Sequence, residues 1–187
     1  MHMTYQLDSL SLRRDSEKAK GVLAEVELRL NDLNYFYPSF SSWFNTKVLP
    51  NIATGERTIL TEYRNGELAG LAILKDSETE KKLCCLRVFE RYQSSIMGIR
   101  LFEKSFEILN TSLPLLSVSE EQLSSFQRVF NYFGFSLEAT LEGYYRPNKR
   151  EFVYNGSLSN DHLLISDLLS QRPDENFSHH SFILEGK

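Results

Sequence analysis

The sequence has 187 residues, 41% of them hydrophobic and 25% charged, and this length favours one compact unit over two full domains. Its 13 Phe, 9 Tyr and single Trp supply enough core-forming side chains to exclude disorder along the whole chain. The net charge of -4 disfavours a broad phosphate-binding surface, so nucleic acid is not an expected partner. No stretch approaches the ~20 apolar residues that cross a bilayer, and residues 1–8 lack the apolar run of a secretory signal. We therefore expect a cytoplasmic protein without membrane contact.

The cysteines and histidines do not predict a metal site. Cys84 and Cys85 are neighbours in an apolar run, where successive side chains of a strand point to opposite faces. A disulfide between them is therefore not expected, and none of the four histidines stands at a metal-ligand spacing from that pair. We interpret both cysteines as small buried side chains, and the alternative is a thiol near an active site.

The first part of the chain combines strand and helix patterns. Residues 5–12 alternate loosely and predict an opening strand. Apolar residues recur between Val22 and Leu33 at helical spacing, which predicts an amphipathic helix beginning near Asp15 or Ser16. An aromatic loop at residues 34–38 follows. A shorter helix then ends at Pro50, with its apolar positions at Phe40, Trp43, Phe44 and Val48.

Three strands come next, with clear connections. Residues 57–63 alternate and are rich in β-branched side chains, and residues 68–74 continue as their partner. Asn65-Gly66 between them is the favoured pair for a two-residue type I′ hairpin. After a polar turn, residues 83–89 are apolar on both faces apart from Arg87, which predicts a strand in the middle of the sheet.

The chain from residue 97 to residue 154 contains two more predicted helices. Residues 97–110 predict a helix, and residues 114–118 a short strand. Ser119 and Gln122 form a capping-box pair that predicts a helix start, and Gly134 ends that helix. Residues 135–145 and 151–154 form a closing antiparallel pair around a turn at residues 147–148. The fold class is α+β, with a central mixed, mostly antiparallel sheet flanked by helices.

The turn between the middle strand and the following helix is the most informative segment for function. A helix N-terminus offers unpaired backbone N–H groups and a partial positive charge, so a strand entering such a turn can cradle a phosphate. Gly98 is the one glycine in this turn that lets the backbone approach a ligand closely. This geometry alone would suit many strand–helix turns.

The same segment resembles the acyl-CoA-binding motif of the GNAT superfamily of N-acyltransferases, which reads Val-x-Pro-x-x-(Gln/Arg)-x-x-Gly-x-Gly. Val88, Gln93 and Gly98 match the pattern, whereas Glu90 and Ile96 replace its proline and its first glycine. Residues 126–135 resemble the family's later helix that ends in Gly-Phe. The resemblance covers residues 4–155, so we expect a GNAT-like domain at residues 1–155 and an extension at 156–187 with a short helix and a polar tail.

The resemblance implies a splayed V between the strand that ends at Val88 and the strand at residues 114–118. Acetyl-CoA or another acyl-CoA would lie in this V as co-substrate. The pantetheine would pair with the backbone near Leu86 and Val88, and the pyrophosphate would lie on the amides of the following turn. The cofactor-binding positions of that turn are Gln93, Ser94, Ser95, Ile96, Met97 and Gly98.

Acyl transfer to an amine needs a group that takes a proton and a group that protonates the leaving thiolate. The family's usual tyrosine acid corresponds here to Phe130, and its usual carboxylate corresponds to Leu83. The remaining catalytic candidates are Glu62, Arg87 and Tyr132, with Glu80 as a further carboxylate. The alternative for each charged candidate is a solvated or salt-bridged side chain.

The residues that bind the amine acceptor are predicted less clearly than those that bind the acyl-CoA. Tyr35, Trp43 and Tyr144 are candidate substrate-binding residues, and the alternative is that the aromatic segment forms a core seam. The apolar residues of the extension predict a short helix at 163–169, which packs on its own domain, joins a second copy into a homodimer or covers the acceptor site.

Two functions from different classes follow from the resemblance. The first is an N-acyltransferase acting on a primary amine of a small molecule, peptide or protein. The second is a catalytically weak or inactive domain that binds CoA or a protein partner. A transferase acting on aminoacyl-tRNA is a third option that the acidic balance disfavours.

Overall fold

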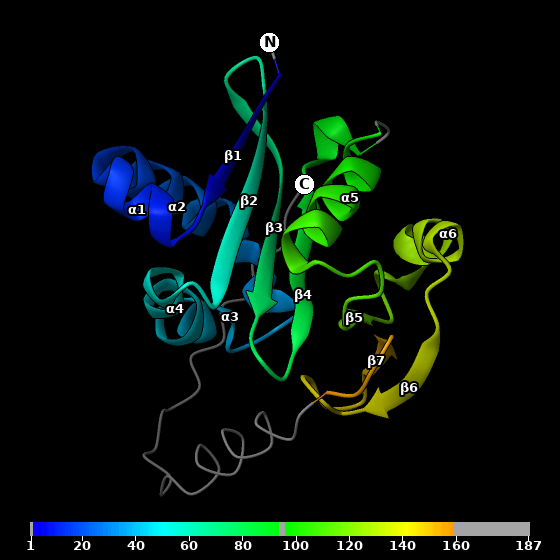
Figure 1. Cartoon of the computed structure of the whole chain (residues 1–187). Coiled ribbons are helices and arrows are strands. Elements are labelled where there is room, and N and C mark those ends of the chain that lie inside the picture. The colour runs from blue at the N-terminus through cyan, green and yellow to red at the C-terminus, as the bar shows by residue number, and fades with distance from the viewer. Residues whose placement is uncertain (1, 94–95, 159–187) are drawn as a thin grey trace, which may run out of the picture.

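The computed structural model describes residues 2–93 and 96–158, and within them the chain forms two antiparallel sheets flanked by helices (Figure 1). The predicted α+β class is confirmed. The four-stranded sheet has the order β1-β2-β3-β4 and the three-stranded sheet the order β5-β7-β6. The strands are β1 (His2–Leu7), β2 (Arg57–Arg64), β3 (Glu67–Asp76), β4 (Lys81–Val88), β5 (Leu116–Ser119), β6 (Leu137–Glu142) and β7 (Arg150–Tyr154).

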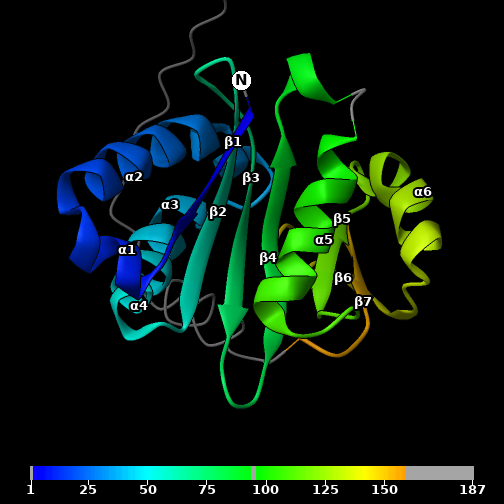
Figure 2. The ribbon, with the colours of Figure 1, turned by 45° about the horizontal axis from the view of Figure 1, so that its top comes forward.

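The helices cover both faces of the four-stranded sheet. Those on one face are α1 (Ser9–Arg14), α2 (Ser16–Leu30), the 3-10 helix η1 (Asn31–Tyr35), α3 (Phe40–Trp43), the π-helical turn η2 (Phe44–Val48) and α4 (Leu49–Thr54). The 3-10 turn η3 (Glu90–Tyr92) and α5 (Met97–Leu109) follow β4, and α6 (Leu123–Phe133) follows β5. Figure 2 shows α5 on the opposite face from α1–α4, between the four-stranded sheet and α6. None of the described helices has both the length and the apolar character that a membrane span requires.

Each face of the four-stranded sheet has its own core. On the α1–α4 side, buried residues of α2 and η2 pack on Leu7 and Ile59 of the sheet. On the other side, Leu101 and Phe102 of α5 pack on Ala72 and extend the core to Phe130 of α6. Because both faces of β2 and β3 are covered, these two strands are buried almost from end to end.

The hairpin between β2 and β3 has the predicted geometry. Asn65 and Gly66 both adopt positive φ angles, 51° and 83°, as a type I′ turn requires. Glycine and asparagine tolerate this backbone region better than other residues, so the pair fixes the register of the two strands.

The opening strand is shorter than the alternation of residues 5–12 predicts. It ends at Leu7, because Asp8 caps α1: its carboxylate accepts from the Ser11 amide at 2.8 Å, and Ser11 Oγ accepts from the Asp8 amide at 2.8 Å. This reciprocal capping box satisfies two otherwise unpaired amides and outweighs a loose strand pattern.

Two predicted helix boundaries were also wrong. Pro50 lies in the first turn of α4, where its missing N–H costs nothing, and Gly55 with φ 86° ends that helix. Ser119 belongs to β5, and α6 begins after Gln122 without a side-chain cap. The pairing of Ser119 with Glu151 across β5 and β7 replaces the expected capping box.

The predicted place of β4 in the middle of the sheet was wrong as well. It is the last strand of the four-stranded sheet, and Leu83 is its one buried residue among Lys81–Val88. Lys81 is exposed, and the other residues of the strand are half-buried because the neighbouring β5 belongs to the second sheet.

Gly70 allows α5 to lie close to the sheet. A Cβ atom added to Gly70 would lie 2.9 Å from Leu101 Cδ1 and 3.0 Å from the Arg87 carbonyl oxygen. The first distance is shorter than real Cβ contacts and the second is tighter than most of them, so a larger residue would force Leu101 or the backbone to shift. The close approach fixes where α5 begins relative to the end of β4.

We expect Gly70→Ala to lower the free energy of unfolding by about 1–3 kcal/mol, because the added methyl group overpacks this contact. Urea denaturation measures the change. Gly21→Ala is the matched control: nothing lies within 4 Å of its added Cβ in the exposed part of α2, so alanine should stabilise by about 0.5–1 kcal/mol. Equal stability of Gly70→Ala and the original chain would show that α5 is free to shift.

Candidate active site

The strands β4 and β5 meet at one point and then separate. The Leu83 amide donates to the Leu115 carbonyl at 2.9 Å, and the Leu115 amide donates to the Lys81 carbonyl at 3.0 Å. These bonds form an isolated parallel bridge, beyond which β4 pairs with β3 and β5 pairs with β7. In Figure 1 the second sheet curves away from β4. The predicted divergence of these strands is confirmed.

An extra residue in β4 interrupts the alternation of its side chains between the two faces of the sheet. Ile73 pairs with Cys85 and Leu74 pairs with Leu83, so Cys84 is left over as a bulge. Both cysteines consequently pack against the core on the α1–α4 side, and the expectation that they point to opposite faces was wrong. They are free thiols, and burial raises the pKa of Cys85 to about 12.

Beyond the bulge, β4 directs peptide groups toward the diverging β5. The Phe89 amide donates to the Ala69 carbonyl of β3 at 3.0 Å. Because peptide groups of a strand alternate between its two edges, those of Leu86 and Val88 face the opposite edge. The Gln93 side chain donates to the Val88 carbonyl there at 3.2 Å. We call the β4 edge at Leu86 and Val88 the open edge.

The N-terminus of α5 lies beside the open edge. Among the described residues, no side chain caps this helix, and no acidic residue occupies its first turn. The Ile96 side chain is 60% exposed, whereas Met97 is fully buried. A Cβ on Gly98 would contact Val88 Cγ2 at 3.8 Å, an ordinary distance. Ser94 and Ser95, the two remaining positions predicted for the cofactor, lie outside the described residues.

Glu62 is fully buried in a charged cluster under α5. Its carboxylate lies 2.7 Å from Lys104 Nζ and accepts from Thr4 Oγ1 at 2.7 Å. His2 Nε2 lies 2.6 Å from Oε2 without the geometry of a hydrogen bond. Strand register separates Glu62 from Val88 by one intervening strand, at Gly70. These contacts give Glu62 a structural use, and its catalytic role stays a prediction.

Arg87 is paired on the α1–α4 side. Both of its terminal nitrogens donate to the Asp32 carboxylate, and this hydrogen bonding lowers the pKa of Asp32. The guanidinium also lies 5.4 Å from the centre of the Phe89 ring. Glu80, the further carboxylate considered, pairs with Lys75 at 2.9 Å.

Tyr132 and Phe130 lie on different sides of α6. Tyr132 is 67% exposed, and Phe130 is 2% exposed among aromatic rings that include Phe102 and Tyr154. Leu83 is likewise buried. The two positions where the family resemblance implies proton-transfer groups are therefore core positions in this chain.

The three predicted acceptor residues have separate contacts. Tyr35 is 75% exposed and meets Phe36 edge to face at 5.1 Å. Trp43 packs near Phe40 under the Arg57 guanidinium, and Tyr144 meets Tyr145 at 4.7 Å. Their shared role in binding a substrate stays a prediction.

The structure brings together a polar group that the sequence analysis did not select. Tyr37 and Tyr145 meet edge to face at 5.0 Å, and Glu151 of β7 is 4% exposed beside them. We call these three residues, with Ser117 and Ser119 of β5, the Glu151 cluster. The only sequence signal for it is an acidic residue at an inward position of an apolar strand.

The electrostatics of the cluster are set by burial. Burial raises the pKa of Glu151 to about 7, although a hydrogen bond from Ser117 and the charges of Arg146 and Lys82 oppose the shift. Burial and the negative charge of Glu151 also raise the pKa values of Tyr37 and Tyr145. Both tyrosines are therefore neutral at ordinary pH.

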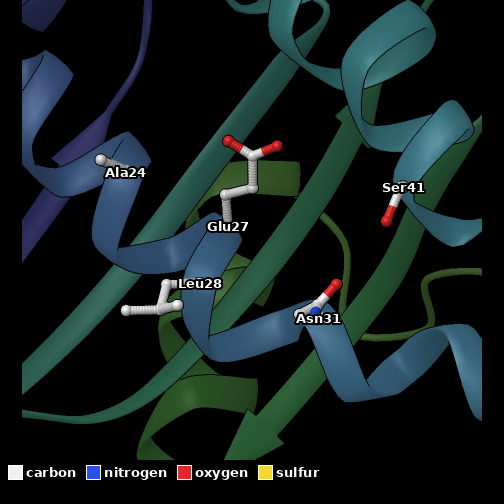
Figure 3. Close-up of a pocket in the computed structure, with 5 residues that line it drawn as sticks. All are labelled: Ala24, Glu27, Leu28, Asn31 and Ser41. Carbon is white, nitrogen blue, oxygen red and sulfur yellow. The ribbon is translucent and has the colours of Figure 1, made fainter.

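Two surface pockets lie away from these groups. One of about 330 Å³ lies between α2 and α3, and Figure 3 shows its lining by Ala24, Glu27, Leu28, Asn31 and Ser41. The other, of about 720 Å³, lies at the turns after α4 and β3. Neither contains a predicted site residue. Within residues 2–93 and 96–158, no group of three or more His, Cys, Asp or Glu side chains has the arrangement of a metal site.

The raised pKa of Glu151 predicts a stability that depends on pH. Between its ordinary pKa of 4.5 and the folded-state value of about 7, the folded protein holds a proton that the unfolded chain has lost. The free energy of unfolding should therefore fall as pH rises through this range, by on the order of 3 kcal/mol. Glu151→Gln should remove this contribution, as urea denaturation at pH 5 and pH 8 would measure.

Glu138→Gln, at an exposed position of β6, controls for the loss of one carboxylate. The difference in stability between the Glu151→Gln variant and the original chain should grow in favour of the variant as pH rises. A difference that does not change with pH would show that Glu151 does not titrate in this range.

Comparisons with known proteins identify the fold. No family model and no curated protein sequence matches the chain. Escherichia coli ElaA aligns with a TM-score of 0.57 at 15% identity, over 83% of this chain and 100% of that chain. A protein from Desulfovibrio desulfuricans, described as an acetyltransferase of the GNAT family, aligns with a TM-score of 0.53 at 17% identity, over 82% and 97% of the two chains.

A third solved structure contains a bound co-substrate. This Bacillus anthracis protein, described as a streptothricin acetyltransferase, is in complex with acetyl coenzyme A. It aligns with a TM-score of 0.50 at 13% identity, over 59% of this chain and 69% of that chain. Identities of this size show a common fold, and the diverging strands beside a helix N-terminus agree with it. The chain has the GNAT-superfamily fold.

Proposed function

We propose that the chain is an acyl-CoA-dependent N-acyltransferase, which moves an acetyl or other acyl group to a primary amine of a small molecule, peptide or protein. The observation that carries the proposal is the separation of β4 from β5 next to the N-terminus of α5, which no described side chain caps. A strand edge and a helix N-terminus together provide the two kinds of backbone group that coenzyme A requires.

The backbone would bind the two parts of coenzyme A differently. The pantetheine arm carries amide groups, which match the peptide groups of Leu86 and Val88 at the open edge. The pyrophosphate is anionic, and the first-turn amides of α5 with the helix dipole suit it. The Ile96 side chain is exposed, and there is space beside Gly98. Core side chains therefore leave room for the pyrophosphate to approach the helix.

The fold likeness supports the proposal without fixing the acceptor. The matching B. anthracis protein holds acetyl coenzyme A, which shows that this fold accommodates the co-substrate. The amine acceptor of the present chain has to be found by assay, because acceptor sites differ among proteins that share a fold.

The alternative is a domain that binds CoA or a partner without turnover. Phe130 and Leu83 favour it, because apolar core residues occupy the two positions where the family resemblance implies proton transfer. Calorimetric titration with acetyl-CoA tests binding, and release of free thiol over a panel of primary amines tests turnover. Binding without thiol release supports the alternative, and absence of binding contradicts both functions as far as they involve CoA.

Gly98→Glu is expected to weaken acetyl-CoA binding at least 100-fold. The variant places a side chain and a negative charge in the first turn of α5, where the pyrophosphate would lie. An acidic residue near a helix N-terminus stabilises the helix by about 0.3–1 kcal/mol, so the fold should be retained. Calorimetry measures the affinity and circular dichroism confirms the helix content.

Gly98→Ala is the matched control. Its Cβ would contact Val88 at an ordinary 3.8 Å, so we expect acetyl-CoA affinity within about threefold of the original. Unchanged affinity in the glutamate variant would show that the pyrophosphate does not bind at this turn.

A further inference from the structure

The Glu151 cluster joins three segments that are far apart in the sequence. Tyr37 lies between η1 and α3, Tyr145 lies in the connection from β6 to β7, and Glu151 lies in β7. The two tyrosine rings are nearly perpendicular, at 87°. Tertiary structure alone brings these groups together, and the reaction outlined above has not yet used them.

One oxygen of the buried carboxylate has no partner within residues 2–93 and 96–158. Ser117 hydrogen-bonds to Glu151, but in this part of the chain Oε1 has no hydrogen-bond partner, and neither does the neighbouring Ser119 Oγ. Ser119 is 2% exposed and lies directly across from Glu151 on β5. Buried polar atoms in proteins are almost always paired, because an unpaired one loses its hydration without replacement. The two atoms therefore mark a place suited to a polar ligand.

The charged neighbours do not satisfy that oxygen. Arg146 lies near Glu151, but its Nη2 donates to both Glu121 oxygens at 2.9 and 2.7 Å. Lys82 contributes a positive charge, and Glu121 a negative one. A ligand that binds Oε1 must donate hydrogen bonds, and a cation would benefit most from the carboxylate.

The cluster lies on the face of the sheets opposite α5. Leu116 and Val118 of β5 pack in the α5 core, so the alternating Ser117 and Ser119 point to the other face. Tyr37 follows η1 on that same face, and the Cys85 thiol of β4 contributes to raising the pKa of Tyr37. The cluster thus borders the point where β4 and β5 separate, from the side that the α5 N-terminus does not cover.

We infer that the Glu151 cluster is the binding site for the acceptor amine: Glu151 binds the primary ammonium group through Oε1, and Tyr37 and Tyr145 enclose it. This inference rests on the proposed function and adds to it the residues that receive the acceptor. It also defines the substrate class as a cationic primary amine whose nitrogen enters an aromatic, anionic site.

The same carboxylate takes the first proton of the reaction. Glu151 accepts one proton from the ammonium group and becomes a neutral acid, which leaves an amine with a free electron pair. That pair forms a bond to the thioester carbonyl carbon, and the carbon–sulfur bond breaks. The nitrogen releases its second proton and the thiolate takes one up, so the products are an amide and the free thiol of coenzyme A.

The test compares the original chain with Glu151→Gln in the thiol-release assay, with acetyl-CoA and a panel of aliphatic, aromatic and peptide primary amines. We expect acetyl-CoA affinity within about twofold and kcat/KM for the amine lowered at least 100-fold. We also expect the variant to lose the acidic limb of the pH profile near pH 7. The control Glu138→Gln, on the exposed side of β6, should keep both values.

Tyr37→Phe provides a second variant that removes one hydroxyl group and leaves the ring in place. We expect the KM for the amine to rise about fivefold with unchanged acetyl-CoA affinity. This variant decides the inference if Glu151→Gln does not fold. If either variant turns over the amine as fast as the original chain and with the same pH profile, the inference is overturned and the proposed function is not. Absence of turnover by the original chain on every amine overturns the proposed enzyme and the inference with it.

Discussion

The extra residue at Cys84 determines which side chains β4 places on each face of the sheet. Without it, strict alternation would carry the β3–β4 register unchanged to the end of the strand. With it, both cysteines join the α1–α4 core, and Leu86 and Val88 return to the α5 side with their peptide groups at the open edge. A bulge also increases local twist, which favours the separation of β4 from β5 that the candidate site requires.

The separation divides the site into two chemically opposite sides. On one side, the start of α5, which no described side chain caps, offers backbone donors and a partial positive charge, held in place by the close packing at Gly70. On the other side, a buried carboxylate and two neutral tyrosines come from β7 and two loops. Anionic phosphates and a cationic amine would therefore approach the same thioester from different faces. In the proposed function, this arrangement would keep the two ligands from competing for the same groups.

The sequence predicts the elements better than it predicts the site. Local signals suffice for the Asn65-Gly66 hairpin and the helix beginning at Ser16, because turn chemistry and apolar spacing act within a few residues. They failed at Cys84, since a bulge depends on pairing with β3 and leaves no pattern in an apolar run. Glu151 was missed for a related reason: its significance comes from Tyr37 and Ser119, which only the tertiary fold brings near it.

The carboxylate of Glu151 lowers the stability of the fold, whereas a neutral side chain at this position would not. Val153 points to the same face of β7 and is fully buried, which shows that this face accepts apolar packing. Placing an ionisable group there requires either a bound proton or loss of hydration, and burial accordingly raises its pKa to about 7. Positions that depart from local packing rules are concentrated at functional sites. Since a carboxylate with this pKa can exchange a proton near neutral pH, the energetic cost at Glu151 agrees with a role in deprotonating a substrate better than with a role in holding the sheet together.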